Sequence, residues 1–154
     1  MARQTDIGFH LLDRIYGTRI TMHADDPAAA LHVMQDAAAS VRGPLETCPG
    51  CRITFAVPAA IAAARAGEVA LAEQHESQCA YLANVVMRLP AWYAAHDEVR
   101  GHIAAAKGAS ADETAAHFAA AVMRYRGAGQ PVDATRCKQL AVQAASGRAA
   151  RKGH

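Results

Sequence analysis

The sequence predicts a mainly α-helical fold of five or six helices, with a short β-containing zinc knuckle at the centre. Alanine, the residue with the highest helix propensity, makes up roughly a quarter of the 154 residues. Apolar residues recur at spacings of three and four in several segments, which is the period of an amphipathic helix. Large apolar side chains are few, so we expect a thin core between closely packed helices.

The N-terminal part is expected to hold two helices joined by an extended segment. Apolar residues recur every four positions from residue 5 or 6 to Gly17, which predicts a short helix closed by that glycine. Residues 18–23 alternate apolar and polar side chains, which favours a brief strand or extended linker. Two aspartates before Pro27 indicate the start of a second helix, which we expect to end at Arg42-Gly43-Pro44.

Residues 45–57 are expected to form the knuckle and a β-like segment, because Ile53, Phe55 and Val57 alternate with other residues. Proline is favoured in the first turn of a helix, so Pro58 is expected to open the next helix. The remaining helices are expected from residue 58 to about 65, from 68 to about 88, around residues 92–103, from the capping pattern at Ser110 to about 126, and from 133 to 147. We expect one domain over residues 1–147, with the knuckle and its helix at 45–89, and a basic flexible tail at 148–154.

Four residues fit the ligand set of a structural zinc site. Cys48 and Cys51 form a CxxC pair, and His75 and Cys79 lie four positions apart on one face of an expected helix. Tetrahedral zinc is bound in this way, by two thiolates from a tight turn and two ligands from successive helical turns. We therefore predict a Zn²⁺ ion with a purely structural role.

The segment CPGCRITF resembles the first half of a classical zinc finger, with Cys48 and Cys51 followed by an aromatic residue at Phe55 and an aliphatic one at Ile61. The HxxxC pair is similar to the helical half of such a finger. The resemblance covers residues 45–82 only, and 23 residues separate the two ligand pairs, against about twelve in a classical finger. The base-reading positions of a classical finger therefore cannot be transferred to this chain.

Other interpretations of the cysteines remain open. His75 and Cys79 can be ordinary buried residues, and Cys137 can replace His75 as a ligand. A thioredoxin-like redox pair follows a strand and opens a helix, whereas here Cys48 is expected to precede a strand-like segment, the next helix is expected only near Pro58, and no alternation of strands and helices surrounds the motif. Hydrolytic zinc chemistry would need an open coordination position and a carboxylate, for which Glu73 and Glu76 lie near in sequence.

Charge and composition suggest a location and a partner. The net charge is only +2, but all charged residues after Asp133 are basic. They are Arg136, Lys138, Arg148, Arg151 and Lys152. This basic end could follow a phosphate backbone. No secretory signal or membrane-spanning stretch is evident, so a cytoplasmic protein is expected.

We therefore expect a non-catalytic, zinc-stabilised binding protein, regulatory or associated with nucleic acid such as DNA. The alternatives are a protein-interaction or assembly component of bacterial or phage origin with structural zinc, and, less favoured, a CxxC redox enzyme.

Overall fold

The computed structural model describes the backbone of residues 6–40 and 48–152 and the side chains of residues 12–40 and 48–146. Seven α-helices and one π-helical segment, η2, make up this part of the chain. They are α1 (Asp6–Met22), α2 (Pro27–Ala39), α3 (Pro49–Arg65), α4 (Val69–Tyr81), η2 (Leu82–Met87), α5 (Pro90–Ala106), α6 (Ala111–Gly127) and α7 (Pro131–Lys152). The mainly α-helical class is confirmed.

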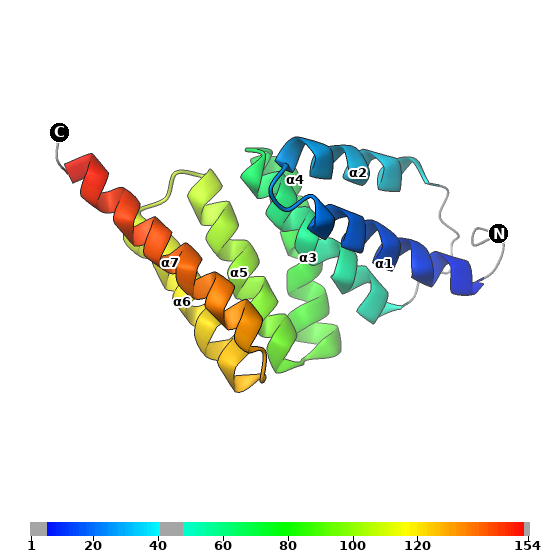
Figure 1. Ribbon diagram of the computed structural model, residues 1–154. Coiled ribbons are helices and arrows are strands. Elements are labelled where there is room, and N and C mark those ends of the chain that lie inside the picture. The colour runs from blue at the N-terminus through cyan, green and yellow to red at the C-terminus, as the bar shows by residue number, and fades with distance from the viewer. Residues whose placement is uncertain (1–5, 41–47, 153–154) are drawn as a thin grey trace.

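The helices form a row in which successive neighbours run in opposite directions (Figure 1). Helices α1 and α2 lie at one end of the row, α3 and α4 in the middle, and α5, α6 and α7 at the other end. Helix α3 contacts α1, α2, α4 and α5, and is therefore the centre of the molecule.

The predicted helix starts agree with the structure at two caps. The carboxylate of Asp26 accepts a hydrogen bond of 3.0 Å from the backbone N–H of Ala29 at the start of α2. The hydroxyl of Ser110 accepts one of 3.1 Å from the N–H of Glu113 at the start of α6. Each bond satisfies one of the free amides in the first turn of a helix.

The β-containing knuckle is wrong, because residues 49–57 are the first half of α3 and no strand occurs in the ranges that the structure describes. Pro58, expected to open a helix, lies inside α3. Gly17, expected to close the first helix, lies inside α1, and residues 18–22 of the expected extended segment also belong to α1. Residues 45–47 of the expected knuckle, and the expected end of the second helix at 42–44, fall outside the described ranges. Residues 148–152, expected as part of a flexible tail, continue α7.

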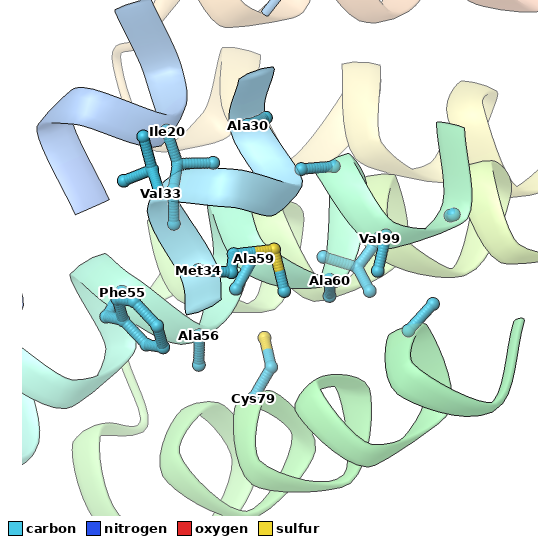
Figure 2. Close-up of a cluster of buried hydrophobic side chains, with 14 of the residues drawn as sticks. Ile20, Ala30, Val33, Met34, Phe55, Ala56, Ala59, Ala60, Cys79 and Val99 are labelled. Atoms are coloured by element: carbon cyan, nitrogen blue, oxygen red, sulfur yellow. The ribbon is translucent and has the colours of Figure 1, made fainter. Parts of the chain in front are cut away.

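The main core surrounds α3 and is built largely from methyl groups. Its alanines pack against Ile20 of α1, Val33 and Met34 of α2, Cys79 of α4 and Val99 of α5 (Figure 2). The buried α3 residues are Cys51, Ile53, Phe55, Ala56, Ala59, Ala60, Ala62, Ala63 and Ala64. Because these residues occupy most sides of α3, the helix has no broad polar face, and its sequence lacks the helical period. The alternation of Ile53, Phe55 and Val57 thus imitates a strand.

Gly17 allows α1 to lie directly against α3. A Cβ atom at this position would be only 2.2 Å from the carbonyl oxygen of Thr54. That carbonyl lies four residues before Pro58, which has no N–H to donate to it. The close approach of the two backbones therefore occurs at the point where α3 lacks a hydrogen bond.

A second core joins α5, α6 and α7, and it encloses a charged network. Glu98, only 2 % exposed, accepts hydrogen bonds of 2.8 Å from both the Nε and Nη2 atoms of Arg136, and one of 2.9 Å from the hydroxyl of Tyr125. Arg136 also contacts Asp133 at 2.6 Å. The network connects the middle of α5 to both α6 and α7.

In the part of the chain that the structure describes, we find no helix with both the length and the apolar character that crossing a membrane would require.

Candidate dithiol site

Cys48 and Cys51 lie in the first turn of α3, the central helix. Cys48 is the N-cap residue with an extended backbone (φ −83°, ψ 99°), and Pro49 occupies the first helical position, where its missing N–H has no cost. The backbone N–H groups of Cys51 and Arg52 both donate to the Cys48 carbonyl, at 3.1 and 3.0 Å. This turn brings the two sulfurs to 3.0 Å from one another.

The two thiols differ in exposure. Cys51 is buried, with 4 % of its surface exposed, whereas Cys48 is half-buried. Burial raises the pKa of the Cys51 thiol, and the hydrogen bond and charge of Cys48 raise it further, while Arg14 acts in the opposite direction. Cys51 is therefore a protonated thiol at neutral pH, and Cys48 is the sulfur that a reagent reaches first.

The surroundings of the pair favour negative charge on an exposed sulfur. The positive end of the helix dipole stabilises a nearby anion. Two cationic side chains, Arg14 and Arg52, lie in the same region, and Arg52 is paired with the buried carboxylate of Asp13 at 3.8 Å. Gly50 lies between the cysteines, and a Cβ atom there would lie 4.0 Å from the Cys48 sulfur and 3.9 Å from Met87 Cε.

The other two predicted zinc ligands point elsewhere. The His75 ring packs edge-on against Phe55, with 5.7 Å between ring centroids. Cys79 has no exposed surface, and its sulfur is turned toward the alanines of α3 (Figure 2). Burial, reinforced by Glu76, raises the pKa of the Cys79 thiol to about 12.

The structure thus brings Cys48 and Cys51 together but does not bring His75 and Cys79 to them. Among the described residues, no three or more His, Cys, Asp or Glu side chains are close enough together to bind one metal ion. The reason is the tight connection at residues 66–68, which makes α3 and α4 an antiparallel pair. In that pair Cys79 lies beside the middle of α3, whereas the CxxC motif lies at its beginning.

Cys137 is also separate from the pair. It packs in the second core with Ala94, Ala121 and Ala134, and burial raises the pKa of its thiol to about 12. The carboxylates weighed for hydrolytic chemistry have other partners: Glu73 pairs with Lys107, and Glu76 with His96, at 2.8 and 2.6 Å.

The predicted basic surface is only partly described. The Arg136 guanidinium is paired with Glu98 and Asp133, although about half of the Arg136 side chain is exposed. Lys138 is exposed on α7. Arg148, Arg151 and Lys152 belong to the last turns of α7, where only the backbone is described.

Sequence reasoning missed the buried network around Glu98. Its one signal was position, because Glu98 immediately precedes Val99 on the apolar face expected for that helix. Its partners Tyr125 and Arg136 are 27 and 38 residues away, and no local pattern joins them.

These features define an all-helical protein with a cysteine pair at the start of its central helix. Comparison of the chain with protein-family models, with curated proteins and with solved structures found no match.

Proposed function

We propose that Cys48 and Cys51 form a reversible dithiol–disulfide pair that exchanges with a disulfide of a partner protein. The observation that carries the proposal is their placement in the first turn of α3, with sulfurs 3.0 Å apart and unequal exposure. Redox cysteines typically occupy such helix N-termini, because the thiolate is the attacking species and this position stabilises it. The helix that the redox interpretation requires at the CxxC motif begins at Pro49.

The exposure of the two sulfurs gives each a role. The Cys48 thiolate attacks one sulfur of the partner's disulfide, which forms a mixed disulfide and releases the other sulfur as a thiolate. Cys51 then loses its proton and attacks the Cys48 sulfur, which forms the Cys48–Cys51 disulfide and releases the second partner thiolate. Two electrons pass from the pair to the partner, and the partner thiolates take up two protons.

Zinc binding by the same two sulfurs is the second candidate, favoured by the CxxC geometry itself. A closed zinc site has four ligands, so two more would have to come from side chains outside the described ranges or from another molecule. In that case the protein would be a zinc-stabilised binding or assembly component, with nucleic acid or protein as its partner.

A trapping experiment tests the exchange. The protein is incubated with oxidised glutathione and analysed by intact mass spectrometry, in parallel with Cys48→Ser, Cys51→Ser and the control Cys79→Ala. We expect the parent and Cys79→Ala to lose two hydrogens, Cys51→Ser to retain one glutathione, and Cys48→Ser to retain little. Equal labelling of Cys48→Ser and Cys51→Ser would contradict the assigned roles.

Metal analysis of the same samples separates the two candidates. One equivalent of zinc in the parent, lost in both serine variants, together with no disulfide formation, would favour zinc and remove the exchange proposal. A metal-free parent that forms the disulfide would favour exchange.

A further inference from the structure

A cavity of about 760 Å³ lies between the two ends of the helical row, away from the cysteine pair. The turn between α1 and α2 borders one side, α3 forms the floor, and α5, α6 and α7 close the other side. Small-molecule sites commonly have volumes of about 300–1,000 Å³. The cavity is therefore large enough for a ligand with two rings or a medium-length chain.

Apolar side chains form most of the wall. Val57, Pro58 and Ile61 of α3, Trp92 and Ala95 of α5, and Leu140 of α7 are part of this wall. Such a wall favours the transfer of an apolar ligand from water, by about 25 cal/mol for each Å² that is buried.

Three of the charged groups at the cavity, Glu98, Asp133 and Arg136, are already paired with one another, and Asp25 and Arg65 also line it. Both oxygens of Glu98 are occupied by Arg136, and Asp133 holds a further nitrogen of the same guanidinium. The Arg65 guanidinium donates to the backbone carbonyl of Ala24. A charged ligand that reached the Glu98–Arg136–Asp133 network would have to compete with these pairs.

His102 is a polar group at the cavity that remains open to a ligand. His102 lines the cavity and packs edge-on against the Phe118 ring at 5.2 Å, but its ring nitrogens make no hydrogen bond with the described residues. Burial lowers the pKa of His102 to about 4, so the ring is neutral at pH 7. A neutral imidazole offers one N–H donor and one nitrogen acceptor, which suits a hydroxyl, carbonyl or amide.

We propose that this cavity binds an uncharged, mainly apolar small molecule, with one hydroxyl, carbonyl or amide group hydrogen-bonded to His102. The inference is independent of the cysteine chemistry, since neither cysteine lines the cavity.

Trp92 provides the measurement, because it is the only tryptophan in the chain and it lines the cavity. N-phenyl-1-naphthylamine, an uncharged two-ring probe with one N–H, is titrated into the protein while Trp92 is excited. We expect saturable energy transfer from Trp92 to the probe. 8-Anilinonaphthalene-1-sulfonate, the same probe with a sulfonate, should bind at least tenfold more weakly. Tighter binding of the sulfonate would overturn the ligand class.

Two variants locate the probe and test the hydrogen bond. Ala91→Phe fills part of the cavity and should weaken probe binding severalfold, whereas Ala120→Phe, a half-buried alanine that does not line the cavity, should leave it unchanged. In competition with the probe, 1-octanol should lose about fivefold in affinity in His102→Phe, which corresponds to one neutral hydrogen bond. The affinity for n-octane should be the same in His102→Phe as in the parent. Equal affinity of Ala91→Phe and Ala120→Phe for the probe would refute the proposal. Equal losses of affinity for 1-octanol and n-octane in His102→Phe would also refute it.

Discussion

Replacement of Gly17 by alanine tests the close packing of α1 on α3. The new Cβ would lie 2.2 Å from the Thr54 carbonyl oxygen and would also approach Phe55 Cα at 3.2 Å. Both atoms belong to the backbone, so no side-chain rotation can relieve the clash. Helix α1 would have to retreat by about 0.8 Å to bring the 2.2 Å contact up to 3.0 Å.

The cost follows from what moves with α1. Tyr16 and Ile20 are 8 % and 2 % exposed, and a gap of 0.5–1 Å forfeits about a quarter to a half of the dispersion attraction at such contacts. Overpacking of this kind costs about 1–3 kcal/mol, and the higher helix propensity of alanine returns up to about 1 kcal/mol. We expect Gly17→Ala to lower the free energy of unfolding by about 1–2 kcal/mol.

Urea unfolding followed by circular dichroism at 222 nm measures this change. With a slope of about 2 kcal/mol per molar urea, the midpoint should fall by about 0.5–1 M. Gly127→Ala is the matched control, because a Cβ at that helical position has no neighbour within 4 Å. It should be neutral or slightly stabilising. A Gly17→Ala protein as stable as the parent would show that α1 does not pack on α3 as described.

Three further changes test other parts of the fold by the same unfolding measurement. Arg136→Met should cost about 1–3 kcal/mol, because it leaves the buried carboxylate of Glu98 without its half-exposed cation, and adding Glu98→Leu should restore part of the loss; an additive double variant would contradict this coupling. Ser110→Ala removes the N-cap of α6 and should cost about 1 kcal/mol, whereas an unchanged midpoint would mean that the cap contributes nothing. His102 has its pKa lowered from 6.5 to about 4, so the stability from its neutral form is present above pH 6.5 and is lost as the pH falls toward 4. His102→Gln should therefore reduce the loss of stability over that range relative to the parent, and identical profiles would refute the assignment.

The helices that could be predicted are those with a local signal. Asp26 with Pro27 marks the start of α2, and Ser110 marks the start of α6, because a cap acts within one turn of the chain. Helix α3 could not be predicted in this way, since burial on most of its sides removes the helical period, and Pro58 falls where no sequence rule expects a helix interior.

The candidate site was predictable in part for the same reason. The pairing of Cys48 with Cys51 is local, and the structure brings these two sulfurs together. The joining of that pair to His75 and Cys79 depends on how α3 and α4 pack, which spacing along the chain does not determine. The cavity is even harder to predict from the sequence, because its wall combines residues from distant parts of the chain, from Ile20 to Gln143.

Because the surface of α3 is rich in alanine, the centre of the molecule tolerates smaller side chains but not larger ones. A methyl group has no rotatable side-chain bond, so ordering it costs almost no side-chain entropy, and removing one leaves only a small void. Ala59, Ala60 and Ala63 have no exposed surface, so any added methylene must displace a neighbouring helix. Evolutionary drift at these positions is therefore one-sided: glycine can enter at a cost of about 1 kcal/mol in helix propensity, but serine, valine or leucine requires a compensating reduction on the facing helix.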